Sequence, residues 1–265
     1  MKLAICFFGI TRNLKQFTLD SIQQHLMAAA AEHDPNYLKF GHFNLVQRIK
    51  NPRTGEKDVQ VEADEYKLLQ CDTVATTDQS RLDGQLDFAS VEKYGDCWED
   101  GFIALRNFLR QLYSLDQVTK LLTQSGQDFD VVIYSRADLR FQRKIEIPRI
   151  RPGTLYTPWF AKSGGLNDRF AMGDLATMTT IGQRLALVRE YCEDTGKPLH
   201  AERFLKWYAD HKGLRTADLT DIDFCRVRAN GYIPVPDANP KAGFKQRWKH
   251  TVSRLKNLAP GSSGG

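Results

Sequence analysis

Cysteines are few in this sequence, and their spacing suggests neither a disulfide framework nor a metal site. The chain has five, an odd number, with no C-x-x-C pair: Cys6, Cys71, Cys97, Cys192 and Cys225. This arrangement argues against disulfide-stapled folds and cysteine zinc sites. Reduced thiols are typical of a cytoplasmic protein, and that is the location we expect.

Long hydrophobic runs are also absent. The first apolar run, residues 3–10, is much shorter than the roughly 20 residues that a membrane span requires. Thr11-Arg12-Asn13 follows it, so there is no small-residue cleavage site of the kind that ends a secretory signal. We therefore interpret the run as a buried strand.

Several common catalytic and nucleotide-binding motifs are missing as well. The sequence contains no G-x-G-x-x-G, no G-x-x-x-x-G-K-[ST], no H-x-x-x-H and no G-x-S-x-G. A Rossmann dinucleotide site, a P-loop, a zincin and the usual serine hydrolase are therefore not supported.

What is present is ordinary globular composition with one basic end. The 265 residues are 42% hydrophobic and 26% charged, which suits one α/β domain. Residues 241–256 carry six Lys or Arg and no acid; subtracting these six from the net charge of +5 leaves about −1 for the rest. Binding of nucleic acid over the whole surface is therefore not indicated. We predict a domain over 1–240 and a basic amphipathic segment with a flexible tail over 241–265.

The basic segment has an apolar stripe at helical spacing, formed by Phe244, Trp248, Val252 and Leu255. Such a helix suits peripheral contact with an anionic membrane, here the inner membrane face, through residues 241–256. The alternative is that the stripe packs on the main domain and leaves a solvated basic face.

Strand and helix patterns alternate along the chain. We expect strands near 2–8, 37–46, 130–135, 154–160 and 224–228, and helices near 16–31, 98–112, 114–123, 175–193 and 199–211, with a turn at 51–56 and a polar loop over 69–86. Ser114, three residues before Gln117, suits a capping box at the beginning of the helix over 114–123. This order predicts an α/β fold whose mainly parallel sheet has helices on both faces. In such sheets ligands bind beyond the carboxyl ends of the strands.

Two candidate groups follow predicted strands. Gly9 allows close approach of the backbone to a ligand, and Arg12 lies within reach of a pyrophosphate, although for this pair taken alone an ordinary turn is the better explanation. In Arg136-Ala137-Asp138, the carboxylate suits a divalent cation that bridges phosphates, and the guanidinium suits a phosphate itself. A surface ion pair is the alternative for this triplet.

Two further carboxylates are candidates for acid–base chemistry. Asp168 lies in a glycine-rich segment, 163–174, which we expect to be a loop that folds over a substrate, with Asp174 capping the next helix. Glu202 begins a predicted helix, where the helix dipole alone would favour a glutamate. Either carboxylate has the chemistry of a general base for an acceptor hydroxyl.

Six segments in chain order carry a resemblance to a known family. They are Gly-x-x-Arg at 9–12, Leu-x-Gln-x-x-Ser at 109–114, Arg-x-Asp-Leu-x-Phe at 136–141, Asn-Asp-x-Phe-Ala-x-Gly at 167–173, the helix with Glu202, and Val-Arg-x-x-Gly at 227–231. Together they resemble bacterial and viral glycosyltransferases of polysaccharide assembly, which have a GT-A-like nucleotide-sugar-binding domain.

The resemblance implies transfer of a sugar from a nucleotide-diphosphate donor to a hydroxyl of a glycan or lipid-linked acceptor. The family's Asp-x-Asp motif maps onto 136–138, so only Asp138 carries over as a ligand of Mn²⁺ or Mg²⁺, with Arg136 in place of the first aspartate. The implied roles are nucleotide-sugar binding by Gly9, Thr11, Arg12, Arg136 and Arg228, and base catalysis by Glu202, with Asp168 as the competitor.

Two alternatives of another class remain. The chain is a non-catalytic nucleotide- or glycan-binding relative if Arg136, in place of the first aspartate, means that a metal site has been lost. It is a nucleic-acid-binding protein if the basic segment binds DNA or RNA, which we do not expect.

Overall fold

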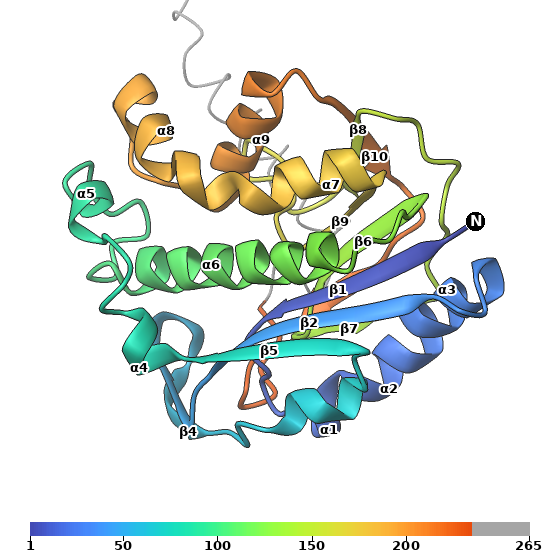
Figure 1. Ribbon diagram of the computed structural model, residues 1–265. Helices are drawn as coiled ribbons and strands as arrows, with labels where there is room; N and C mark the ends of the chain where they lie inside the picture. The colour runs from blue at the N-terminus through green and yellow to red at the C-terminus, as the bar shows by residue number, and fades with distance from the viewer. Residues whose placement is uncertain (235–265) are drawn as a thin grey trace, which may run out of the picture.

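A seven-stranded sheet forms the centre of the computed structural model, which describes residues 1–234 (Figure 1). Its strands lie in the order β10 (Arg215–Leu219), β8 (Thr154–Pro158), β9 (Phe170–Gly173), β6 (Val131–Arg136), β1 (Leu3–Gly9), β2 (Leu38–Leu45) and β5 (Thr73–Asp78). Strand β9 runs antiparallel to β6 and β8, and the other neighbouring pairs are parallel. The predicted mainly parallel α/β class is confirmed.

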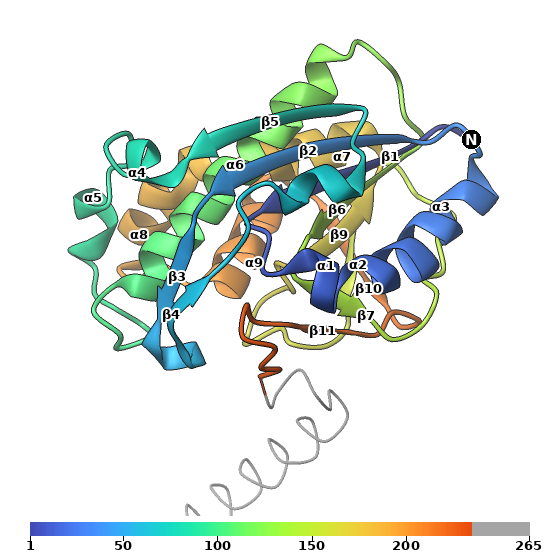
Figure 2. The same ribbon diagram turned by 90° about the horizontal axis from the view of Figure 1, so that it is seen from below.

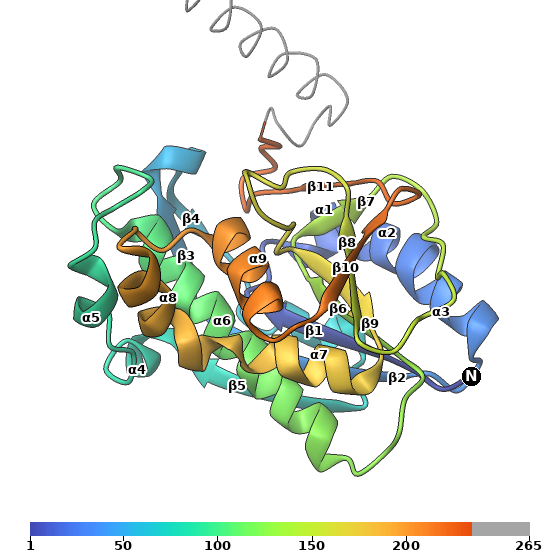
Figure 3. The same cartoon turned by 90° about the horizontal axis from the view of Figure 1, so that it is seen from above.

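Helices cover both faces of this sheet, so β1 has no exposed side chain. All seven residues of β1 are buried, as its continuous apolar sequence predicts. On one face lie α6 (Ile103–Gln124), α7 (Leu175–Gly182), α8 (Val188–Thr195) and α9 (Ala201–His211); on the other lie α1 (Leu14–Phe17), α2 (Leu19–Ser21), a π-helical segment (Ile22–Met27) and α3 (Ala28–His33). Figure 3 shows the two helical layers with the sheet between them.

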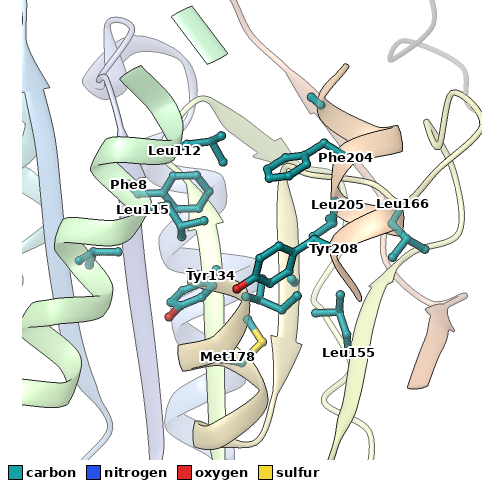
Figure 4. Close-up of a cluster of buried hydrophobic side chains, with 14 of the residues drawn as sticks. Phe8, Leu112, Leu115, Tyr134, Leu155, Leu166, Met178, Phe204, Leu205 and Tyr208 are labelled. Carbon is teal, nitrogen blue, oxygen red and sulfur yellow. The ribbon is translucent and has the colours of Figure 1, made fainter. Parts of the chain in front are cut away.

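The larger core joins α6 and α9 to the sheet (Figure 4). Phe8 of β1 and Tyr134 of β6 pack below Leu112 of α6, and Phe204 and Tyr208 of α9 close the cluster from the other side. Burying each such side chain stabilises the fold by about 1.5–3 kcal/mol. This packing fixes the beginning of α9 near the carboxyl ends of β1 and β6.

The first helical region is interrupted where a single helix is predicted. Thr18 has φ −129°, outside the helical range, and its buried hydroxyl donates a 2.9 Å hydrogen bond to the carbonyl of Ala137. The tie to the turn after β6 therefore competes with helix continuation. The bounds 16–31 are close to correct, but the predicted regularity is not.

Two other predicted helix boundaries are wrong. Ser114 does not cap a second helix, since α6 continues through it and its hydroxyl bonds elsewhere. The predicted helix over 175–193 is divided into α7, a 3₁₀ segment (Gln183–Leu187) and α8. The division comes at Gly182, where an added Cβ would lie 1.9 Å from the Thr119 hydroxyl, so only glycine permits this approach of α7 to α6.

The polar segment 69–86 is not a loop. It contains β5, preceded by a 3₁₀ turn (Glu65–Leu69) and followed by α4 (Gln79–Leu82), with α5 (Ala89–Glu92) beyond. Strands β5 and β10 form the two edges of the sheet, and most of their side chains are exposed or half-buried. An edge strand of this kind lacks the apolar pattern by which strands are predicted.

Two small antiparallel pairs complete the described fold. The hairpin of β3 (Arg48–Asn51) and β4 (Glu56–Gln60) turns through a 3₁₀ segment (Pro52–Thr54), which confirms the predicted turn. Strand β7 (Leu139–Phe141) pairs with β11 (Phe224–Arg226). Figure 2 shows the hairpin and β11 at one side of the molecule, and a 3.0 Å bond from Asn230 Nδ2 to the Gly55 carbonyl links the segment after β11 to the hairpin tip.

Within residues 1–234, the helices are too short or too polar to cross a bilayer. The predicted basic segment at 241–265, and with it the proposed membrane contact through 241–256, lies outside the described residues, as does the predicted boundary at residue 240.

Candidate functional site

A cleft lies at the carboxyl ends of β1 and β6, as the fold class predicts. It encloses about 910 Å³, including space open to solvent. Seven of the eight predicted site residues line it: Gly9, Arg12, Arg136, Asp138, Asp168, Glu202 and Arg228. The eighth, Thr11, is buried beside the cleft and is not among the residues that line it in the described part of the chain.

The exit of β1 is held by a hydrogen-bond network that requires Gly9. Gly9 has φ +104°, a conformation that other residues rarely adopt, and its N–H donates a 2.8 Å bond to the Ser114 hydroxyl. Ser114 donates in turn to the backbone carbonyl of His42, and its oxygen lies 3.0 Å from His42 Nδ1. Burial lowers the pKa of His42 to about 4, so the ring is neutral at pH 7. The network fixes the backbone from which Arg12 extends.

Arg136 and Asp138 form a buried two-point ion pair. Arg136 Nε lies 2.8 Å from Asp138 Oδ1, and Nη2 lies 2.5 Å from Oδ2. Burial would raise the pKa of Asp138, but Arg136 and Arg12 outweigh it and hold the pKa well below its usual range. Asp138 is therefore ionised throughout the physiological range.

Arg12 joins this pair to a second buried carboxylate. Its Nε lies 3.3 Å from Asp138 Oδ2, and its Nη1 is paired with Glu56, which has no exposed surface. Glu56 also accepts bonds from the Ala229 N–H and the Thr54 hydroxyl. Burial opposes ionisation of Glu56, yet Arg12 and these bonds lower its pKa. Glu56 thus ties the β3–β4 hairpin and the segment after β11 to Arg12.

Arg228 enters the cleft through the β7–β11 pair. Val227 N–H donates a 2.9 Å bond to the carbonyl of Asp138, which extends that ladder and places Arg226 and Arg228 on either side of Val227. Burial, with Arg12 and Arg226 nearby, lowers the pKa of Arg228 to about 9 although Asp138 opposes the shift. The guanidinium groups therefore exceed the negative charge at this end of the cleft.

The residues around Asp138 do not fit the divalent cation that the family resemblance implies. Both Asp138 oxygens are engaged by guanidinium groups, and the neighbouring carboxylate, Glu56, is paired with Arg12. Among residues 1–234, no three His, Cys, Asp or Glu side chains cluster as ligands would. A cation at Asp138 would have to displace Arg136 and approach two further arginines, Arg12 and Arg228. The predicted role of Asp138 as a metal ligand is therefore not supported by its surroundings.

The other end of the cleft is acidic. Asp168 is in the predicted loop, although 170–173 of that segment forms strand β9. The loop packs tightly on α9: Leu166 N–H bonds to the Glu202 carbonyl at 2.9 Å, and an added Cβ on Gly165 would lie 1.8 Å from that oxygen. Glycine at 165 is thus required to bring Asp168 beside Glu202. Asp174 caps α7, as predicted.

Glu202 differs from Asp138 in its electrostatic environment. It is 8% exposed, and burial together with the Asp168 charge raises its pKa to about 7, against the opposing effect of Arg169. Arg169 Nη2 lies 3.5 Å from Glu202 Oε1, and His200 Nδ1 lies 3.3 Å from Oε2. A carboxylate of this kind can accept a proton near neutral pH. His200 also stacks on Trp98, which lines the cleft.

One glutamine connects the two ends. Arg136 Nη1 donates a 2.8 Å bond to Gln111 Oε1, and Gln111 Nε2 donates a 3.2 Å bond to Asp168 Oδ2. Gln111 and Ser114 belong to the Leu-x-Gln-x-x-Ser segment of α6, so that segment contributes directly to the site. Sequence analysis did not predict a role for Gln111 or Arg226. No local pattern indicates that Glu56, in a polar turn sequence, is buried.

The α/β fold thus brings buried arginines and acidic side chains together in one cleft. The chain belongs to a family described as a domain of unknown function (DUF7796), whose model matches residues 108–243. The match includes Gln111, Arg136, Asp138, Asp168, Glu202 and Arg228, and it excludes the β1 exit and the hairpin.

Other comparisons are remote. No curated protein sequence matches the chain. Among solved structures, the chain is similar to mouse xyloside xylosyltransferase 1 in its apo form, with a TM-score of 0.44 and 12% identity over 83% of this chain and 85% of that one. So distant a similarity does not define the activity of this chain.

Proposed function

We propose that this protein is a glycosyltransferase that moves a sugar from a nucleotide-diphosphate donor to a hydroxyl of a glycan or lipid-linked acceptor. One observation carries the proposal: Arg12, Arg136 and Arg228 share a single cleft with Glu202 and Asp168. The six sequence segments that resemble glycosyltransferases support it. All six contribute residues to this cleft or to the elements that border it.

The reaction needs two kinds of group, and the cleft contains both. In net terms, the bond between the anomeric carbon and a diphosphate oxygen breaks and its electron pair remains on that oxygen. The acceptor oxygen bonds to the anomeric carbon, and its proton passes to a carboxylate. Arginines stabilise the charge that develops on the diphosphate. Glu202 accepts the proton, and Asp168 is the second candidate for that role.

The positions of Gly9, Arg12, Arg136 and Arg228 on the cleft wall support nucleotide-sugar-binding roles for them. Thr11 has at most an indirect role, because its side chain is buried beside the cleft. The proposed reaction uses no divalent cation, because the side chains near Asp138 do not suit one.

A panel of UDP-, GDP-, CMP- and dTDP-sugars tests the proposal. Thermal unfolding with each donor is measured first, and release of nucleotide is then measured with the donors that bind. We expect one class of donor to raise Tm and to be hydrolysed slowly in the absence of acceptor. Binding without turnover under any condition indicates the non-catalytic relative, and no response to any donor contradicts the proposal.

A further inference from the structure

Three segments far apart in the sequence bring guanidinium groups to one buried carboxylate. Arg12 follows β1, Arg136 ends β6 and Arg228 follows β11, and all three affect the ionisation of Asp138. Asp138 is only 2% exposed, and it is ion-paired with Arg136 and Arg12. The buried Asp138 therefore holds arginine side chains in place.

The positive charge in this cluster is not balanced by the described carboxylates. Three guanidinium groups, those of Arg12, Arg136 and Arg228, face the two carboxylates of Asp138 and Glu56. The Nε of Arg228 is buried and has no hydrogen-bond partner among residues 1–234. Buried excess charge and a buried donor without an acceptor are costly, and an anion would relieve both.

We propose that Arg12, Arg136 and Arg228 bind the diphosphate of the donor without a bridging divalent cation, and that Asp138 is the counter-ion that positions these arginines. This inference rests on the proposed function, because it assigns the diphosphate of that donor to a particular wall of the cleft.

The chemistry of arginine suits this task. Guanidinium groups are planar and charged at neutral pH, and each has five N–H donors, so an arginine that pairs with a carboxylate still has donors for phosphate oxygens. Side chains already fixed by Asp138, Glu56 and Gln111 lose little freedom when the diphosphate binds. They also meet the negative charge that develops on the leaving diphosphate, which is the role a metal ion has in other sites.

The test is calorimetric titration of the full chain with inorganic pyrophosphate, in EDTA and again in excess Mg²⁺ or Mn²⁺. The proposal predicts binding in EDTA. It is overturned by binding that appears only after the metal is added, or by no binding under either condition.

Arg228→Met is the decisive variant, because it leaves the buried pairs of Asp138 intact. We expect the affinity for pyrophosphate in EDTA to fall about 10- to 100-fold, as for loss of one charged hydrogen bond. The matched control is Arg189→Met, which removes an exposed arginine on α8 that pairs only at the surface with Glu193. We expect it to change affinity by about twofold at most. Equal affinity in the Arg228→Met variant and in the control contradicts the proposal.

The Asp138→Asn variant shows whether Asp138 acts as a counter-ion or as a metal ligand. If Asp138 is a counter-ion, its neutralisation removes a repelling charge, and pyrophosphate binding in EDTA stays within about tenfold of the wild type. If Asp138 holds a bridging cation, the wild type binds only in excess Mg²⁺ or Mn²⁺, and the variant no longer binds there. Arg228→Met decides the question alone if Asp138→Asn does not fold.

Failure of this inference can be told from failure of the proposed function. Metal-dependent pyrophosphate binding together with sugar transfer overturns the inference and leaves the function standing. Metal-independent pyrophosphate binding, with no response to any nucleotide-sugar, leaves the anion site standing and contradicts the function.

Discussion

Asp138 and Glu202 line the same cleft and are buried to a similar extent, 2% and 8% exposed, yet their pKa values shift in opposite directions. Burial raises the pKa of both. Two guanidinium groups in contact with Asp138 reverse the effect there, whereas the neighbouring Asp168 adds to it at Glu202. In this cleft the charged neighbours, and not burial, determine which carboxylate holds other side chains in place and which can accept a proton.

The largest expected effect is on catalysis at the acidic end. Replacement of Glu202 by glutamine removes the proton acceptor while keeping its shape, so we expect kcat for sugar transfer to fall by about 10²- to 10⁴-fold with little change in donor affinity. Steady-state kinetics with Asp168→Asn as the comparison variant checks this. A greater loss of kcat in Asp168→Asn would assign the base to Asp168.

The arginine end should respond with a loss of stability instead. Asp138→Ala leaves Arg136 and Arg228 without their counter-ion and leaves Arg12 with Glu56 alone. Removal of one partner of a buried pair costs about 3–5 kcal/mol. Urea unfolding at pH 7 measures the free energy of unfolding. If Asp138 had no structural role, as is common for a carboxylate at a strand end, the free energy of unfolding would change little. A stability equal to that of the wild type would therefore contradict the role of Asp138 as a counter-ion.

A smaller effect with the opposite sign is expected for the stability of Glu202→Gln. The folded pKa of Glu202 lies above its unfolded value, so the folded state holds more protons between about pH 4.5 and 7 and loses stability as the pH rises through that window. The glutamine variant avoids this loss. We expect it to be more stable than the wild type by about 1–3 kcal/mol at pH 8, and the difference to vanish below about pH 4.5.

Thermal unfolding at several pH values checks this difference. Glu146→Gln is the matched control, since Glu146 is exposed and lies outside the cleft. If the difference in stability between Glu202→Gln and the wild type does not change with pH, then the charged form of Glu202 does not destabilise the folded state.

The parts of the fold that bury apolar surface on both sides could be predicted from the sequence. Strand β1 and strand β6 have continuous apolar sequences, and both are buried strands at the centre of the sheet. The edge strands β5 and β10 were missed because their side chains face solvent and carry no hydrophobic pattern. Ser114 was misread as a helix cap because its actual partners, Gly9 and His42, are distant in the sequence.

The sequence was sufficient to predict which residues line the site, but not which of them form ion pairs with one another. The rule that ligands bind beyond the carboxyl ends of parallel strands located Arg12, Asp138 and their neighbours in one cleft. No local pattern shows that Glu56, 44 residues beyond Arg12, would be its buried partner. Asp138 likewise suits a metal ion when the sequence alone is considered, but the folded chain surrounds it with arginines. One of them, Arg228, reaches Asp138 only because distant segments pair as β7 and β11.

The most direct test is the structure of crystals soaked in EDTA with the nucleotide diphosphate of whichever donor raises Tm. The account predicts that the diphosphate lies against Arg12 and Arg228 with no metal ion between them, and that its sugar-bearing end faces Glu202. A nucleotide bound elsewhere on the protein would contradict it, as would a cleft that stays empty in EDTA and binds the nucleotide only in a parallel soak with Mg²⁺ or Mn²⁺ held by Asp138.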